Sequence, residues 1–146
     1  MTSEVTVRIA RIDDAPFLTL LDREELGYDY PEKDTREKLA SCLSRPYERI
    51  FVAEIGGVPA GYAHAALYDV LYAGTKVNIL GIAVGKAFKR RGAGRALLSS
   101  VEDWARAESA DGVRLASGES RKDAHAFYRA LGYESNKVQL RFMKKI

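Results

Sequence analysis

The chain of 146 residues is poor in the residues that staple small secreted folds and build metal centres. It has a single cysteine, Cys42, and two histidines, His64 and His125. One cysteine excludes an internal disulfide framework and a metal site made of several thiolates. No apolar run approaches the roughly 20 residues that a membrane-spanning helix needs. These absences predict a protein of the reducing cytoplasm, with no metal site and no membrane partner.

An excess of charge is also missing. Lys and Arg total 23 and Asp and Glu total 20, which leaves a net charge of +3. This charge is too small to indicate nucleic-acid binding, and the basic residues do not form a long stripe. With 47% hydrophobic and 29% charged residues, the composition is that of a soluble folded protein. The length predicts one domain over residues 1–146 and no nucleic-acid partner.

The spacing of apolar residues predicts a mixed α/β domain. Alternating patterns and turn signals predict strands over 5–9, 49–54, 58–67, 76–84, 112–117 and 138–145. Helical spacing predicts helices from about 13 to 27, 34 to 45, 93 to 108 and 121 to 131. Ser120 is the expected cap of the last helix. A right-handed crossover would make the strand at 112–117 parallel to the strand at 76–84.

One stretch combines positive charge, glycines and a helix start. Gly92 and Gly94 permit a tight turn, and the following helix offers free N–H groups and the positive end of its dipole to an anion. A solvated basic loop is the alternative for this segment alone. No Gly-Lys-Ser/Thr follows, which excludes a phosphate-binding NTPase loop. Five basic residues and no acid lie between positions 86 and 95: Lys86, Lys89, Arg90, Arg91 and Arg95.

Two motifs resemble those of the GNAT superfamily of N-acetyltransferases. The stretch Lys89-Arg90-Arg91-Gly92-Ala93-Gly94 resembles its coenzyme A turn, Arg/Gln-x-x-Gly-x-Gly/Ala, with Lys in the first position. Residues 121–133 resemble the motif Asn-x-x-Ala-x-x-x-Tyr that ends in Leu-Gly-Phe/Tyr, and the matching residues are Ala124, Tyr128, Leu131, Gly132 and Tyr133. The resemblance implies the GNAT fold, a mixed and mostly antiparallel sheet flanked by about four helices and splayed between its fourth and fifth strands.

The resemblance also implies acetyl-coenzyme A as the cofactor and a set of residues around it. The pantetheine arm would pair with one strand, the pyrophosphate would lie on the amides of the turn, and Tyr128 would protonate the departing thiolate. Arg121 stands where many members have Asn, and it could reach a coenzyme oxygen. The implied cofactor-binding residues are Ile82, Ala83, Val84, Lys89, Arg90, Arg91, Gly92, Ala93, Gly94, Arg95, Arg121 and Phe127.

The acceptor is less defined by the sequence. Six acids between Asp22 and Asp34, with Tyr28 and Tyr30, form either a solvated helix end or an acidic, aromatic-lined wall for a cationic amine. We therefore expect acetylation of a primary amine on a small cationic molecule. The alternatives are a protein or peptide amine, or a non-catalytic acyl-coenzyme A-binding regulatory module. Family habit suggests a homodimer formed through the C-terminal strand.

A general base is missing from its usual places. Residues 77–81 lack the glutamate common on the fourth strand, and Ala116 stands where protein N-terminal acetyltransferases of this type carry one. A lysine-like amine has a pKa of about 10.4 and must lose a proton before it attacks. The sequence leaves open a water relayed by His64, Glu24 or Glu25.

Overall fold

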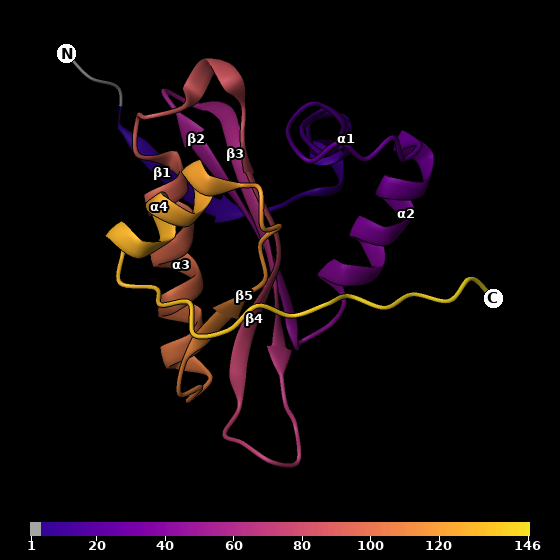
Figure 1. Cartoon of the computed structure of the whole chain (residues 1–146). Coiled ribbons are helices and arrows are strands. Elements are labelled where there is room, and N and C mark those ends of the chain that lie inside the picture. The colour runs from indigo at the N-terminus through magenta and orange to yellow at the C-terminus, as the bar shows by residue number, and fades with distance from the viewer. Residues whose placement is uncertain (1–3) are drawn as a thin grey trace. The chain divides into compact units, whose positions relative to one another are not determined.

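Five strands form one sheet in chain order in the computed structural model, which describes residues 4–146 (Figure 1). β1, β2, β3 and β4 pair with their neighbours antiparallel, and β5 pairs with β4 parallel. The predicted mixed, mostly antiparallel sheet is therefore confirmed. The strands are β1 (Val5–Ile9), β2 (Glu48–Ile55), β3 (Val58–Tyr68), β4 (Lys76–Val84) and β5 (Val113–Leu115).

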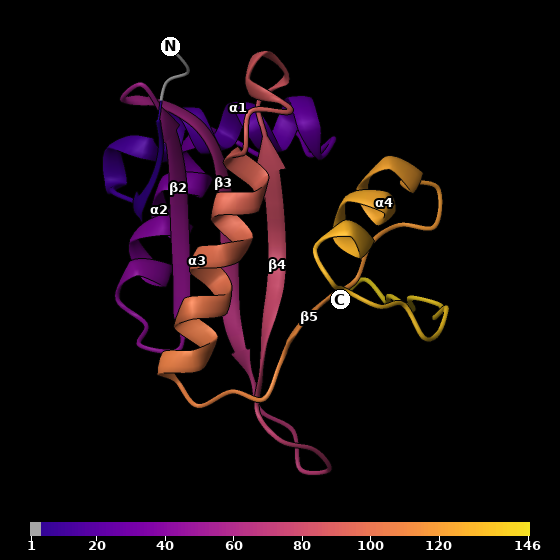
Figure 2. The ribbon, with the colours of Figure 1, turned by 90° about the vertical axis from the view of Figure 1, so that its left-hand side faces the viewer.

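In the part of the chain up to Leu115, helices cover both faces of the sheet. α3 (Ala93–Ala107) lies on one face, and α1 (Ala15–Glu25) and α2 (Glu32–Leu43) lie on the other (Figure 2). α3 has an apolar stripe at helical spacing, and its members Leu97, Leu98, Val101, Trp104 and Ala105 are all buried. Two short 3-10 helices complete this part, η1 (Ile12–Asp14) and η2 (Lys86–Phe88).

The core on the side of α1 and α2 includes Leu18, Leu21 and Leu39, which pack with Val52 and Tyr62 of the sheet. α2 begins two residues before the predicted start at Asp34, and Pro31 is its N-cap. Proline tolerates this position because its fixed φ suits a helix entrance. No helix among residues 4–146 is long and apolar enough to cross a membrane.

The chain groups into two compact units, the part up to Leu115 and Ala116–Ile146, which are described separately. The second unit contains α4 (Lys122–Ala130), and Gly132, two residues beyond its end, is in the left-handed conformation with φ +92°. The N–H of Tyr133 donates to the carbonyl of Tyr128 at 3.0 Å, which closes the helix end as the glycine predicts.

The predicted helix cap Ser120 is wrong. The N-cap of α4 is Arg121, with φ −84° and ψ 63°, and no side chain caps the helix. The N–H of Lys122 donates to the carbonyl of Ser120 at 2.9 Å, so a tight turn separates the serine from the first helical residue. Because a cap must directly precede that residue, Ser120 lies one position too early.

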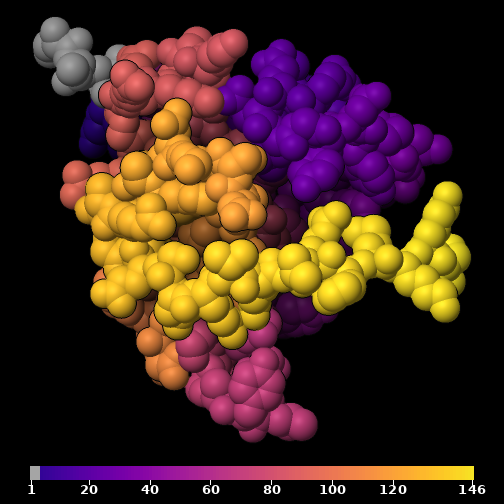
Figure 3. Space-filling view, in the orientation of Figure 1, coloured from indigo at the N-terminus to yellow at the C-terminus, as the bar shows by residue number. Residues whose placement is uncertain are grey.

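The predicted strand over 138–145 is also wrong. No strand is present in the described residues after Gly132, and Figure 3 draws this segment in yellow as a narrow chain. Val138, Leu140 and Phe142 alternate as a strand requires, yet they are 79%, 81% and 89% exposed. Alternating apolar residues indicate a strand with one apolar face, but they do not show that a partner strand is present. A strand needs such a partner to accept and donate its backbone hydrogen bonds.

Candidate functional site

β4 has a free edge over its second half. β5 pairs only with Val77, Asn78 and Ile79, whereas β4 continues to Val84. Beyond Ile79 no described strand pairs with this side of β4, so the sheet separates between strands 4 and 5 as predicted. An unpaired edge presents backbone N–H and C=O groups to any extended ligand that carries amides. Ile82, Ala83 and Val84 lie on this edge.

A β-bulge marks the point where the free edge begins. His64 of β3 pairs with Gly81 of β4, but the next residue, Ala65, pairs with Ile79. Leu80 is therefore the extra residue, and it is 54% exposed. Bulges twist a strand locally and redirect its side chains and backbone groups, and they are common next to active sites.

The turn after β4 presents backbone amides at the start of a long helix. Gly92 is the N-cap of α3, with φ +90° and ψ 1°, in the left-handed region that favours glycine. No side chain caps this helix, and the first helical hydrogen bond runs from the N–H of Ala96 to the carbonyl of Gly92 at 3.0 Å. The amides of Ala93, Gly94 and Arg95 precede that bond, so they are available to an anion. Arg90 also has a positive φ of 63°.

The basic side chains around this turn are not equivalent. Lys89 Nζ lies 2.5 Å from Glu25 Oε1, and the Glu25 side chain is only 11% exposed. The guanidinium of Arg91 lies over the Phe88 ring, 5.9 Å from its centroid. Lys89, which is predicted to bind the cofactor, therefore forms an ion pair with the last residue of α1. This ion pair connects the turn to the helix in which the acidic segment begins.

The acidic segment does not form a uniform wall. Tyr62 donates a hydrogen bond to Asp22, and burial of Asp22 raises the pKa of its carboxyl group despite this bond. Tyr30 has Lys38 over its ring at 5.7 Å, while Tyr28 is 62% exposed. Asp22 and Glu25 therefore point from α1 toward the sheet and the turn.

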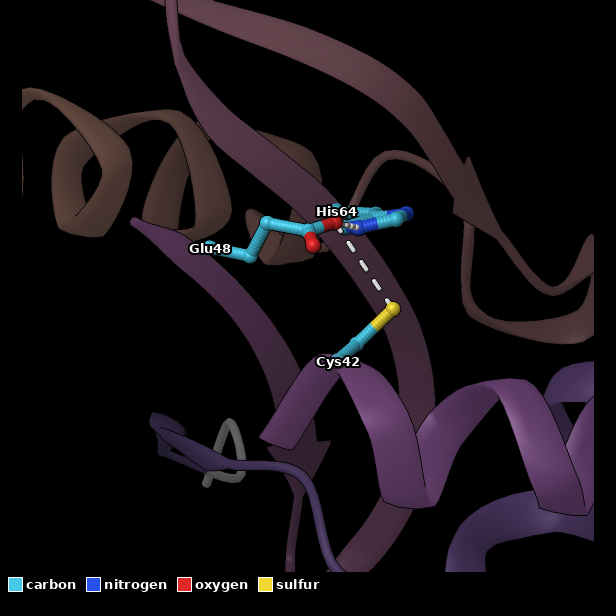
Figure 4. Close-up of side chains that lie close together, drawn as sticks. All are labelled: Cys42, Glu48 and His64. Atoms are coloured by element: carbon cyan, nitrogen blue, oxygen red, sulfur yellow. Dashed lines mark hydrogen bonds and ion pairs between the residues drawn. The ribbon is translucent and has the colours of Figure 1, made fainter. Parts of the chain in front are cut away.

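A second polar cluster joins α2 to the middle of the sheet (Figure 4). His64 Nε2 lies 2.8 Å from Glu48 Oε1, and Cys42 Sγ lies 3.7 Å from the same oxygen. Arg45 Nη1 donates to Glu48 Oε2 at 2.7 Å. Burial alone raises the pKa of Glu48 most, but the hydrogen bonds from Arg45 and His64 outweigh it and lower the pKa below its ordinary value. Glu48 is therefore a buried carboxylate with partners on both oxygens.

The donor atoms of Cys42, Glu48 and His64 lie within 4.8 Å of one another, and their types are those that zinc prefers. Arg45 supplies a positive charge to the same carboxylate. Burial, followed by the charge of Glu48, raises the pKa of the Cys42 thiol, which favours the protonated form that does not bind metal.

In the second unit, Tyr128 is 8% exposed, and its ring contacts those of Phe127 and Tyr133 at centroid distances of 5.5 and 6.1 Å. Burial raises the pKa of Tyr128, and the charge of Arg121 offsets part of this shift. His125 Nε2 bonds to the carbonyl oxygen of Gly118 at 2.9 Å, which gives this histidine a local partner.

The predicted cofactor-binding residues between Ile82 and Arg95 thus lie on one continuous strand and turn. Arg121, Phe127 and Tyr128 lie together on or beside α4, in the other unit. Sequence reasoning missed Glu48 and the pair of Asp22 with Tyr62. No local signal points to these partners, which are 16 and 40 residues apart in the chain.

A family model and a related protein both match most of the chain. The family model described as Acetyltransferase (GNAT) family matches residues 15–133. An uncharacterised N-acetyltransferase from Methanocaldococcus jannaschii is 29% identical over 151 residues, which cover 97% of this chain and 67% of that protein.

Solved structures share the fold at low sequence identity. The aminoglycoside N-acetyltransferase AAC(6')-Iy in complex with coenzyme A has a TM-score of 0.88 and 19% identity, covering 100% of this chain and 98% of its own. A transcriptional regulator from Bacillus halodurans has a TM-score of 0.86 and 18% identity, covering 97% of this chain and 100% of its own.

Proposed function

The chain belongs to the GNAT family of acetyltransferases, enzymes that use acetyl-coenzyme A, and we propose that it acetylates the primary amine of a small cationic molecule. The observation that carries this proposal is the free edge of β4, which leads through a short connection into the uncapped start of α3. An extended amide-bearing arm and a pyrophosphate are the two chemical groups that such an edge and such a turn accept.

Acetyl-coenzyme A supplies the acetyl group as a thioester. We assign the pairing with its pantetheine amides to the backbone of Ile82, Ala83 and Val84. We assign the pyrophosphate to the amides between Arg90 and Arg95, with Gly92, Ala93 and Gly94 keeping side chains away from it. Arg90, Arg91 and Arg95 add positive charge around the phosphates. Lys89 is assigned the same role, for which its ammonium must exchange its pairing with Glu25 for the phosphates. In the second unit, Arg121 and Phe127 are assigned a polar and an apolar contact with the coenzyme.

Tyr128 is assigned the role of general acid. A group that donates a proton to a departing thiolate must itself be protonated at neutral pH. A tyrosine with its ordinary pKa of about 10 already carries its proton at neutral pH, and burial raises the pKa of Tyr128, so the hydroxyl has a proton to donate.

The choice of a cationic acceptor is supported by the acids of α1. Asp22 faces the sheet beside Tyr62 rather than open solvent, and carboxylates attract cations. Glu25 is already paired with Lys89, so Asp22 is the acid that carries this argument. AAC(6')-Iy, which shares the fold, is described in complex with the bisubstrate analogue CoA-S-monomethyl-acetylneamine.

A panel of acceptors tests the proposal. The purified chain is given acetyl-coenzyme A with neamine, spermidine or a lysine-containing peptide, and release of the coenzyme thiol is followed together with the mass of each product. Acetylation of neamine or spermidine supports the proposal. Acetylation of the peptide alone would contradict it and would show that the acceptor is a peptide amine. Tight binding of acetyl-coenzyme A without turnover of any amine would favour the regulatory alternative, whose fold precedent is the Bacillus halodurans regulator.

We also propose that two chains pair through the segment after Gly132. Val138, Leu140 and Phe142 present exposed apolar side chains at alternate positions, a pattern that a second strand would cover. Sedimentation equilibrium of the full chain and of a Leu140→Glu/Phe142→Glu variant checks this proposal. A dimer that becomes a monomer in the variant supports it, and a monomeric parent contradicts it.

A further inference from the structure

The proposed reaction needs a group that removes a proton from the acceptor. A primary alkyl amine with a pKa of about 10.4 is almost entirely ammonium at neutral pH, and an ammonium nitrogen has no lone pair with which to attack. β4 carries no acid, and Ala116 directly follows β5, so neither of the usual positions has an acid that would take this proton.

Resting on the proposed function above, we propose that His64 is the general base, that it accepts the amine proton at Nδ1, and that Glu48 is the residue that positions its imidazole. One proton moves from the acceptor ammonium to Nδ1, and the freed lone pair forms the new N–C bond to the acetyl carbon. The C–S bond of the thioester then breaks, and coenzyme A leaves as a thiolate that takes the proton of Tyr128, as assigned above. The second amine proton leaves the nitrogen as the amide forms and restores the tyrosine, and the imidazolium returns its proton to water. No metal or oxidant takes part.

The position of His64 is the first support. It lies on β3 directly opposite Gly81, at the bulge where the free edge of β4 begins. Cα atoms of paired residues in an antiparallel sheet are about 4.5 to 5.5 Å apart, so the imidazole belongs to the strand next to the proposed acetyl-binding edge.

The absence of a side chain at Gly81 is the second support. A Cβ built on Gly81 would have Tyr62 Oη at 3.4 Å and Leu26 Cδ1 at 4.0 Å as its nearest neighbours. These neighbours show that Gly81 faces the side of the sheet on which α1 lies. Tyr62 and His64 are two residues apart on β3, so both side chains lie on that same side. An acceptor amine over Gly81 would therefore have His64 and the hydroxyl of Tyr62 as its polar neighbours.

The hydrogen bond to Glu48 fixes which nitrogen is available. Glu48 is ionised at neutral pH because its pKa is lowered, and an ionised carboxylate only accepts hydrogen bonds. Nε2, 2.8 Å from Glu48 Oε1, must therefore carry the hydrogen, which leaves the lone pair on Nδ1. Among residues 4–146 the structure records no partner for Nδ1. Figure 4 shows the imidazole with its second nitrogen turned away from Glu48.

Charged groups from several elements surround the imidazole. Glu48 from β2 contacts Nε2, and Arg45 from the connection before β2 balances the charge of that carboxylate. Asp22 from α1 interacts with His64 through its charge, and the raised pKa of the Cys42 thiol keeps α2 from adding a second negative charge.

Replacement of His64 by glutamine tests the role. The glutamine amide can still donate to Glu48, but it has no basic nitrogen. With an alkyl amine acceptor at neutral pH we expect kcat/KM to fall by roughly 10² to 10⁴. The loss should shrink as the pH rises toward the pKa of the amine, and it should be small with hydroxylamine, which is already unprotonated at neutral pH. Affinity for acetyl-coenzyme A, measured by calorimetry, should be unchanged.

Three further measurements separate this role from the alternatives. His125→Gln is the matched control, because His125 has a local partner, and its rate should equal that of the parent. Nitrogen NMR of the parent should show His64 as the Nε2–H tautomer. In Glu48→Gln both neutral tautomers should be populated, because the glutamine amide can either accept a hydrogen bond from Nε2–H or donate one to an unprotonated Nε2. Dialysis against EDTA should leave the rate unchanged.

The outcomes are distinguishable. Turnover by the parent with an equal rate in His64→Gln would overturn the base while leaving the proposed function intact. A rate lost on chelation and restored by zinc would assign the cluster of Cys42, Glu48 and His64 to a metal instead. A parent that acetylates no amine would overturn the proposed function, and the base with it.

Discussion

The ion pair between Arg8 and Asp14 gives a prediction whose size follows from its burial. Nη1 and Nη2 of Arg8 donate to the two carboxylate oxygens of Asp14, both at 2.8 Å, and the N–H of Arg11 donates to Asp14 at 2.7 Å. The side chain of Asp14 is 7% exposed and that of Arg8 is 21% exposed. This pair attaches the start of α1 to β1, and α1 carries Asp22 and Glu25 at its other end.

Arg8→Ala leaves the Asp14 carboxylate buried with only one of its three donors. Breaking a fully buried pair costs about 3 to 5 kcal/mol. Because water reaches one side of Arg8 and the Arg11 amide remains, we expect a loss of about 2 to 3 kcal/mol in the free energy of unfolding. The matched control is Arg106→Ala, whose ion pair with Asp103 has side chains 72% and 73% exposed and should contribute less than about 1 kcal/mol.

Urea unfolding of both variants, with Asp14→Asn and the double variant Arg8→Ala/Asp14→Asn, measures the pair directly. The sum of the two single losses in unfolding free energy should exceed the loss in the double variant by more than ~1 kcal/mol, because the second change removes a charge that the first has left unpaired. A loss in Arg8→Ala no larger than that in Arg106→Ala, or strict additivity in the cycle, would refute the reasoning.

The same pair sets a pH dependence. Burial alone raises the pKa of Asp14 most, but the hydrogen bonds from Arg8 and the Arg11 amide, with the charge of Arg8, lower it below its ordinary value. A lowered pKa means that the unfolded chain takes up the proton first as the pH falls. The stabilisation is therefore complete above the unfolded pKa of about 3.9 and is lost as the pH falls toward the folded value. In Asp14→Asn the unfolding free energy should therefore depend less on pH over this acidic range.

Two further predictions concern the proposed cofactor site. Tyr128→Phe should lower kcat by roughly 10² to 10⁴ with little change in affinity for acetyl-coenzyme A, because the ring keeps its contacts and only the proton donor is lost. An unchanged kcat in steady-state assays would remove Tyr128 from the mechanism. Gly61→Ala should destabilise the fold by about 1 to 3 kcal/mol and weaken cofactor binding, since the new Cβ would lie 2.7 Å from the carbonyl oxygen of Ala83 and must displace β4. An unfolding free energy in urea and a calorimetric affinity equal to those of the parent would contradict this prediction.

The parts of the fold that the sequence predicts are those with strong local signals. Residues 76–84 form an apolar run before a glycine turn, and the structure has β4 over these same residues and α3 starting at Ala93. Gly132 predicts the end of the last helix because only a residue that tolerates a positive φ closes it. Local signals fail where a neighbour decides the outcome, as for the predicted strand at 138–145, which has no partner among the described residues.

The candidate site divides in the same way. The glycine turn and the strand before it are continuous in the chain, so their motif is readable from the sequence. The contact between Glu48 and His64 depends on the pairing of β2 with β3, and that of Asp22 with Tyr62 depends on how α1 packs on the sheet. Such contacts combine register and packing, and neither has a periodic signal of its own.

Binding of acetyl-coenzyme A to the parent, Gly92→Val and Gly57→Val tests the central claim most directly. Both glycines have a positive φ, +90° and +80°, and neither has a neighbour closer than 3.8 Å to an added Cβ, so both variants carry a similar backbone strain. By calorimetry and thermal shift, we expect the ligand to stabilise the parent and Gly57→Val by about 2.7 kcal/mol at 100 times Kd. Gly92→Val, folded but with a side chain in the turn, should bind at least tenfold more weakly. Equal affinity in all three proteins would contradict the assignment of the turn, and no binding to the parent would contradict the account as a whole.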